Sequence, residues 1–242
     1  EKFFKWVDSQ DNSVKYVTFH GGEPMLFMKR INEIMEWLAP MAKRNNWLIS
    51  FTTNGSLVVE NEAFFEKYQG ILAATVSYDF MFQKDNREEF DVEAMAAILT
   101  KYCNRWQWQW VLPIDHPKSF SFENISNVVN TCYKTGCTTL NIIPLRHHRG
   151  ANKFTVFIDD IDLKQYMEAF FEFLQVLYVK RIDTYIDGNY KFVDKAYFAD
   201  HSKLILGPDG FIYPEFEWLE YKKVDARSEE RRVGKECLRL CR

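Results

Sequence analysis

One short loop of the sequence combines two glycines, a carboxylate and a proline. The stretch YVTFHGGEPML (residues 16–26) leaves an apolar strand-like run through Gly21 and Gly22, and Glu23 and Pro24 follow. Paired glycines give backbone that carries no side chains and that a ligand can approach closely, while proline fixes one backbone dihedral beside the acid. The loop therefore predicts that a ligand lies against this backbone.

Five segments of the chain read as strands, and each is followed by a segment of helical periodicity. The strand-like runs are rich in β-branched and aromatic residues, whereas the segments after them repeat apolar residues at helical spacing. This alternation predicts a parallel sheet with right-handed crossovers. The predicted strands are Val14–His20, Trp47–Asn54, Leu72–Asp79, Gln107–Ile114 and Thr138–Leu145, and the predicted helices are Met28–Asn45, Asn61–Gln69, Asp91–Asn104, Phe122–Thr135 and Leu163–Lys180.

One face of the predicted strands is polar. Parallel strands that are covered on both faces usually read as continuous apolar runs, whereas these alternate. The alternation predicts that the polar face lines a shared cavity, as in a barrel, while the apolar face meets the helices. Since barrel enzymes place their chemistry at the carboxyl ends of the strands, we expect a binding site there. The polar residues are Thr18, His20, Ser50, Thr52, Asn54, Thr75, Ser77, Asp79, Gln107, Gln109, Thr139 and Asn141.

The composition favours one α/β domain and argues against two classes of partner. The chain has 242 residues, of which 47% are hydrophobic, and a formal net charge of −3. No basic stripe interleaved with aromatic residues is present, so we expect no nucleic acid partner. The apolar runs are short and broken by charge, so we expect no membrane association, and the first ten residues lack a signal-peptide pattern, which favours a cytoplasmic location.

The cysteines predict reduced thiols and no metal site. Five cysteines at irregular spacing include one C-x4-C pair and one C-x3-C pair, and neither pair has further ligands at zinc-finger spacing. They are Cys103, Cys132, Cys137, Cys237 and Cys241.

An ordered set of motifs resembles the radical SAM (S-adenosylmethionine) enzymes. The motifs are TFHGGEPML, SFTTNGSL and ATVSYDF, which close three successive predicted strands, and TLNIIPLR further on. The resemblance covers Lys15 to Leu145 and extends more loosely to Glu220. It is closest to the branch that modifies peptides and proteins, which includes the sulfatase-maturating enzymes. The family's fold is a partial (β/α)6 TIM-like barrel, in agreement with the polar cavity.

The resemblance implies an oxidoreductase that cleaves SAM reductively to a 5′-deoxyadenosyl radical, which abstracts a hydrogen atom from a peptide or protein substrate. An electron donor such as a flavodoxin or a ferredoxin would reduce its 4Fe–4S cluster. No residue stands out as a catalytic acid on the substrate side. The cofactor-binding residues implied by position are Gly21, Gly22, Glu23 and Pro24 for the methionine ammonium, Asn54 near the SAM site, Ser77 and Asp79 for the ribose and the methionine part, and Gln109 and Asn141 for substrate or adenosine.

The sequence departs from the family's pattern at the cluster. Radical SAM enzymes bind the cluster through a C-x3-C-x2-C loop after the first barrel strand, and this spacing is absent from the chain. The opening EKFFKWVDSQ reads like a remnant of the helix that would follow that loop. We therefore expect a chain truncated before its first strand, which does not ligate the cluster of the full-length protein and is inactive as a fragment.

The carboxyl-terminal part predicts a hairpin and a tail. LILGPDGFIYPEFEW reads as two apolar strands around Pro208, Asp209 and Gly210, and it resembles the start of an extension that carries auxiliary clusters. Glu215 stands after Tyr213 and Pro214 where that extension commonly has a cysteine. We expect a barrel at residues 1–200, the hairpin at 201–225, and a non-native or disordered tail at 226–242.

Two other functions stay open from the sequence. One is a non-catalytic scaffold that binds SAM or a substrate without a cluster. The other is an unrelated barrel enzyme with a phosphorylated ligand at its glycine-rich loops. The second alternative fits less well because Glu23, beside the glycine pair, would repel a phosphate.

Overall fold

The chain forms two compact units, residues 1–189 and residues 190–242. The computed structural model describes residues 2–9, 16–86, 89–112, 118–144, 163–186, 205–206 and 212–213. The predicted domain boundaries and the predicted tail stay predictions because most of residues 187–242, with Cys237 and Cys241, lie outside these ranges.

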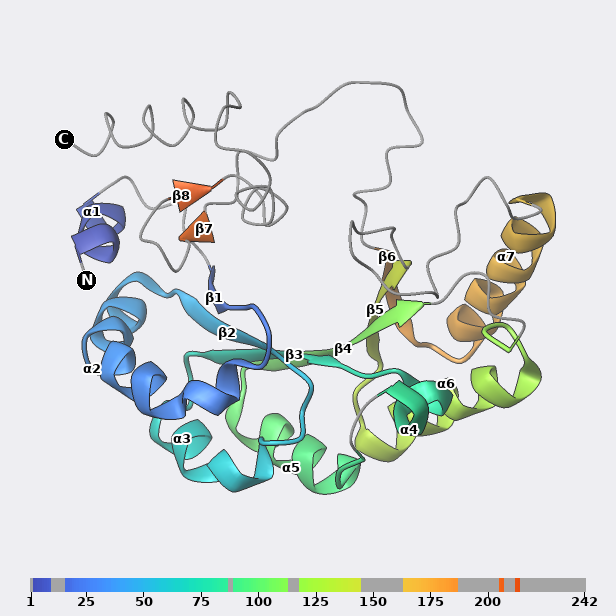
Figure 1. The fold of residues 1–242 in the computed structure, drawn as a ribbon, viewed down its shortest axis with the longest axis horizontal. Helices are drawn as coiled ribbons and strands as arrows, with labels where there is room; N and C mark the ends of the chain where they lie inside the picture. Colours follow the sequence, from blue (N-terminus) through green and yellow to red (C-terminus); the bar gives the residue numbers. More distant parts are fainter. Residues whose placement is uncertain are drawn as a thin grey trace. The chain divides into compact units, whose positions relative to one another are not determined.

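The first unit contains a parallel sheet whose strands follow one another in chain order. All five neighbouring pairs are parallel, and the order is β1-β2-β3-β4-β5-β6 (Figure 1). A doubly wound sheet reverses its strand order at a switch point, whereas a barrel winds in one direction. This strand order confirms the predicted partial TIM-like α/β fold. The sheet is open, as a partial barrel should be. Its strands are β1 (Tyr16–Phe19), β2 (Leu48–Thr53), β3 (Leu72–Ser77), β4 (Arg105–Leu112), β5 (Thr139–Pro144) and β6 (Asp183–Ile186).

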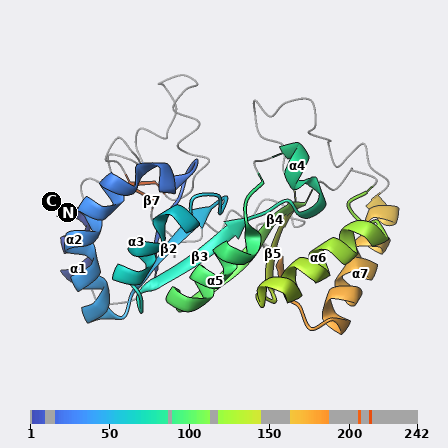
Figure 2. The ribbon, with the colours of Figure 1, turned by 90° about the horizontal axis from the view of Figure 1, so that it is seen from below.

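The helices connect successive strands. α2, α3, α5 and α6 follow the sheet along one side (Figures 1 and 2). The five helices predicted from periodicity are present, with ends that differ from the predicted ones by at most two residues. The helices are α1 (Lys2–Ser9), α2 (Met28–Asn45), α3 (Glu62–Lys67), α4 (Gln83–Asn86), α5 (Val92–Tyr102), α6 (Phe122–Thr135) and α7 (Leu163–Val179), with 3-10 turns η1 (Pro24–Phe27), η2 (Val59–Asn61) and η3 (Phe80–Phe82).

Local capping chemistry explains where several helices begin and end. The Asp91 carboxylate accepts hydrogen bonds from the first backbone N–H groups of α5, and the Ser121 hydroxyl does the same for α6. Gly136 ends α6 with a φ of 69°, a left-handed conformation that glycine adopts without strain.

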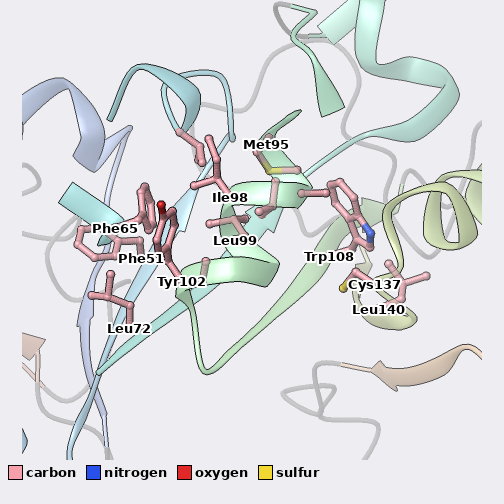
Figure 3. Close-up of a cluster of buried hydrophobic side chains, with 14 of the residues drawn as sticks. Phe51, Phe65, Leu72, Met95, Ile98, Leu99, Tyr102, Trp108, Cys137 and Leu140 are labelled. Carbon is pink, nitrogen blue, oxygen red and sulfur yellow. The ribbon is translucent and has the colours of Figure 1, made fainter. Parts of the chain in front are cut away.

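The core lies between the helices and one face of the sheet. This face carries apolar register pairs: Phe19 pairs with Phe51, and Trp108 pairs with both Val76 and Leu140. Figure 3 shows part of the core, which combines strand residues such as Leu72 with helix residues such as Leu99. The alternation predicted from the sequence therefore places the apolar face where it was expected. The largest fully buried side chains are Trp47, Trp108, Trp110, Phe51, Phe65, Phe173, Met35, Leu38, Ile49, Leu72, Met95 and Leu99.

Two features complete the fold. β6 was not predicted, since Asp183–Ile186 is only four residues long and mostly exposed at the end of the sheet. The predicted hairpin is present, because β7 (Ile205–Leu206) pairs antiparallel with β8 (Ile212–Tyr213), although its turn lies outside the described residues. Within the described part of the chain, no helix is long and apolar enough to span a membrane.

Two phenylalanines on α7 test this packing. Phe173 is fully buried, and its ring centroid lies 5.8 Å from that of Trp110, whereas Phe171 is 54% exposed. We expect Phe173→Ala to lower the free energy of unfolding by about 3–5 kcal/mol, because it leaves a cavity in the core. The matched variant Phe171→Ala should cost less than about 1 kcal/mol. Urea unfolding followed by circular dichroism measures both, and equal losses would contradict the assigned orientation of α7.

Candidate functional site

The candidate site lies where β1, β2 and β3 end. Because these strands are parallel, their carboxyl ends share one edge of the sheet. The glycine loop follows β1, the segment around Asn54 follows β2, and the segment around Asp79 follows β3. The topology thus brings together three of the four motifs that the sequence singled out.

The carboxylate of Glu23 accepts hydrogen bonds from its own loop and from the end of β2. Its Oε1 accepts the backbone N–H of Met25 at 3.0 Å and the hydroxyl of Thr53 at 2.9 Å. Its Oε2 accepts the backbone N–H of Asn54 at 2.7 Å. A carboxylate offers about four acceptor positions, so three protein donors leave room for one more donor. Glu23 therefore joins the glycine loop to the end of β2 and still has capacity for a cationic partner.

The two glycines have the backbone freedom that the sequence predicted. Gly21 has a φ of 104° and Gly22 a φ of 56°, both in the region that disfavours other residues. No heavy atom lies within 4 Å of the position where a Cβ would stand on either glycine. The space beside this backbone is open, as the approach of a ligand would require. Pro24 is buried and starts η1, for which Glu23 is the N-cap residue.

Asn54 organises the turn that faces this loop. Its Oδ1 accepts the backbone N–H of Ser56 at 3.0 Å and the Ser56 hydroxyl at 2.8 Å. These bonds use the acceptor end of the amide and leave the two Nδ2–H donors without a partner among the described residues. The side chain is half-buried, so Asn54 can offer these donors to a ligand.

The end of β3 contains a buried acid and a strained backbone. Asp79 is 7% exposed, and its backbone N–H donates to the Oε1 of Gln83 at 3.0 Å. Phe80 follows with a φ of 53°, a left-handed conformation that costs a bulky side chain energy. Its ring packs against the rings of Tyr78, Trp108 and Trp110, which offsets that cost. Such strain is commonly found at functional sites, although here it has an evident packing cause.

The remaining predicted residues lie in rows across the polar face. The register pairs Ser77 with Gln109 and Gln109 with Asn141. The Gln109 amide donates to the Ser77 hydroxyl at 3.4 Å, a long hydrogen bond. In a parallel row, Thr75 pairs with Gln107 and accepts its amide donor at 3.4 Å. All five side chains are half-buried, so this face stays polar and partly accessible.

Sequence reasoning missed Thr53. The alternation assigned the polar face to Thr52 and Asn54, and Thr53 falls on the opposite side, in register with Val76. Its side chain is only 1% exposed, yet its hydroxyl bonds Glu23 and accepts the backbone N–H of Gly55 at 3.0 Å. A threonine at a core-facing position immediately before an Asn-Gly pair was the available signal.

The described cysteines lack the features of metal ligands. Burial raises the pKa of the Cys103 and Cys132 thiols to about 12, and it also raises the pKa of Cys137. Metals bind the thiolate form, which these environments disfavour. Among the described residues, no group of three or more His, Cys, Asp or Glu side chains could hold a metal ion.

The chain is similar to curated enzymes over part of its length. It is 26% identical over 144 residues to the 4-hydroxyphenylacetate decarboxylase activating enzyme of Clostridioides difficile strain 630, covering 57% of this chain and 43% of that protein. The same enzyme of strain R20291 is 26% identical over 143 residues. The chain thus spans less than half the length of these relatives. No protein-family model matches it.

Solved structures share the fold. The structure of anSMEcpe with bound AdoMet and Cp18Cys peptide superposes with a TM-score of 0.58 at 18% identity, covering 89% of this chain and 64% of that one. Streptococcus suis SuiB bound to precursor peptide SuiA gives a TM-score of 0.60 at 16% identity, covering 88% and 51%. The activating enzyme matched by sequence is a radical SAM enzyme, so the predicted resemblance to this superfamily is confirmed, whereas the predicted truncation stays a prediction. At these identities the structures establish the fold alone.

Two glycines with similar φ angles test the turn after β2. Gly55 has a φ of 86° and Gly70 a φ of 84°, but a Cβ on Gly55 would lie 2.8 Å from the ring of Phe90, whereas a Cβ on Gly70 meets nothing within 4 Å. We expect Gly70→Ala to cost about 1–2 kcal/mol from backbone strain. Gly55→Ala should cost at least about 1 kcal/mol more, because the Phe90 ring must move. Urea unfolding compares the two variants, and an equal loss would show that the turn tolerates a side chain.

Proposed function

We propose that this chain is the barrel part of a radical SAM enzyme that holds S-adenosylmethionine at the carboxyl ends of β1–β3. The observation that carries the proposal is the apposition of the glycine loop and the Asn54 turn through Glu23. This arrangement places the Glu23 carboxylate, the open backbone of Gly21 and Gly22, and the amide donors of Asn54 side by side. They lie at the edge of the sheet where barrel enzymes place their chemistry. Ser77 and Asp79 complete the proposed site from the next strand.

The donors and acceptors of this edge suit SAM. The ammonium group of its methionine part carries three donors, and the open acceptor position of Glu23 and the carbonyl groups of the exposed glycine loop can accept them. The Nδ2 donors of Asn54 suit an anionic or hydroxyl oxygen. When SAM and a reduced cluster are both bound, the family's chemistry is reductive cleavage to a 5′-deoxyadenosyl radical. The barrel residues would orient SAM and exclude water around it.

We further propose that the substrate is a peptide or a protein. The similarity to an activating enzyme of a decarboxylase, and to enzymes solved with Cp18Cys peptide and precursor peptide SuiA, supports this class. The half-buried amides of Gln109 and Asn141 can bond backbone groups of an extended peptide. An electron donor such as a flavodoxin or ferredoxin in the cytoplasm would serve the complete enzyme.

A non-catalytic scaffold that binds SAM is the second candidate function. The observation that favours it is that the 242 residues contain no C-x3-C-x2-C spacing. Sequencing the source DNA for about 60 codons upstream of Glu1 decides between the two. An in-frame C-x3-C-x2-C supports the enzyme, and an in-frame start codon without it supports the scaffold.

Replacement of Glu23 tests the proposed ammonium contact. Glu23→Gln keeps one acceptor oxygen but puts an NH2 group where the other accepts a donor, so we expect SAM binding to weaken by about 1.5–3 kcal/mol. Glu60→Gln, which removes an exposed acid in η2, is the control and should leave affinity unchanged. Titration calorimetry measures both proteins, and equal affinities would remove Glu23 from the site.

Cluster chemistry gives a second test. Because the chain lacks the cysteine spacing that binds the family's cluster, we expect these 242 residues to produce no 5′-deoxyadenosine after anaerobic reconstitution with iron, sulfide and a reductant. Chromatography of the reaction with SAM measures the product. Formation of 5′-deoxyadenosine above a protein-free control would show that other residues bind a cluster.

A further inference from the structure

The Thr53 side chain contributes a hydrogen bond between the glycine loop and the end of β2. Its hydroxyl donates to the Oε1 of Glu23 at 2.9 Å and accepts the backbone N–H of Gly55 at 3.0 Å. Both the donor and the acceptor functions of the hydroxyl are therefore used. At 1% exposure, water cannot replace either partner without a rearrangement.

This contact fixes how the Glu23 carboxylate is oriented. Oε1 is held by Met25 of its own loop and by Thr53, while Oε2 is held by the backbone of Asn54. Loss of the Thr53 hydroxyl would leave Oε1 with a donor from its own loop alone. The carboxylate would then be free to turn about the bond to Asn54, although its charge would be unchanged.

We propose that Thr53 is a positioning residue of the site, which acts on the ligand through Glu23 and Gly55. It aligns the open acceptor position of Glu23 with the glycine backbone and holds the turn that presents Asn54. This inference rests on the proposed function, because the ligand so aligned is S-adenosylmethionine. It assigns to a core-facing side chain a role that neither the motif nor the polar face indicates.

Variants of Thr53 separate orientation from charge better than a variant of Glu23 does. Glu23→Gln removes charge, orientation and one acceptor together, so it cannot separate a ligand contact from a scaffold effect. Thr53→Val replaces the hydroxyl by a methyl group of similar size, so it removes both hydrogen bonds and leaves the charge of Glu23 in place. Thr53→Ser keeps the hydroxyl and should restore the alignment. Thr100→Val is the matched control. The Thr100 hydroxyl on α5 also accepts a hydrogen bond, from the indole N–H of Trp106 on β4, but this pair lies on the exposed surface.

The experiment combines amide hydrogen exchange with SAM binding for the four 242-residue proteins. Exchange of the Met25, Asn54 and Gly55 amides, followed by NMR, reports the alignment without any ligand. Equilibrium dialysis against S-adenosylmethionine reports the affinity. For Thr53→Val we expect exchange at these amides to accelerate about tenfold or more and the dissociation constant to rise about tenfold, whereas Thr53→Ser and Thr100→Val should stay within about threefold of the parent chain.

Each outcome supports or overturns the inference. Unchanged exchange in Thr53→Val would show that the hydroxyl does not hold the loop. Faster exchange with unchanged SAM affinity would reduce Thr53 to a structural residue and overturn the positioning role. A parent chain that binds no SAM would overturn the proposed function, whereas the exchange data would still decide whether Thr53 orients Glu23.

Discussion

The bond between the Glu23 carboxylate and the end of β2 is the interaction on which the candidate site depends. A loop that contains Gly21 and Gly22 loses more conformational entropy on ordering than other loops, and its glycines contribute no side chains to hold it. Hydrogen bonds to a charged acceptor are stronger than neutral ones, and three of them converge on this half-buried group. The carboxylate therefore helps to stabilise a loop whose two glycines contribute no side-chain contacts of their own. The same carboxylate would bind the proposed ligand, so the conformation of the glycine loop and ligand binding depend on one side chain.

The sheet supplies the rigid frame for this bond. Its apolar face is anchored by large buried side chains, among them Trp108 and Trp110 on β4, so the strand ends are fixed by core packing. The opposite face carries Thr75, Gln107 and the row through Ser77, Gln109 and Asn141. Because side chains alternate along a strand, the packing that fixes one face also fixes the spacing of polar groups on the other. The strand register therefore determines both the packing of the core and the positions of the polar side chains at the site.

The sequence alone predicted most of this frame, and the failures have physical causes. Long elements with strong periodicity, such as α2 and β2, were located within one or two residues because burial of one face constrains many positions at once. β6 was missed because an exposed strand of four residues has no alternation to detect. Thr53 was missed because alternation assigns a residue to a face, whereas its partner Glu23 comes from a loop whose path depends on tertiary structure. The strained backbone of Phe80 could not be predicted from the sequence either, because it depends on how the Phe80 ring packs against Trp108 and Trp110 of β4.

The aromatic cluster behind the site has an optical consequence. The ring centroids of Trp106 and Trp108 lie 5.1 Å apart at an interplanar angle of 72°, and the ring of Tyr78 lies 5.3 Å from Trp108. Chromophores this close and this fixed in orientation couple their excited states, and Tyr78 stands between Ser77 and Asp79 in the chain. This cluster therefore contributes to the near-ultraviolet dichroism of the protein, and its contribution reports the side-chain packing at the end of β3. That contribution would disappear in any compact state that keeps its helices but loses fixed side-chain packing.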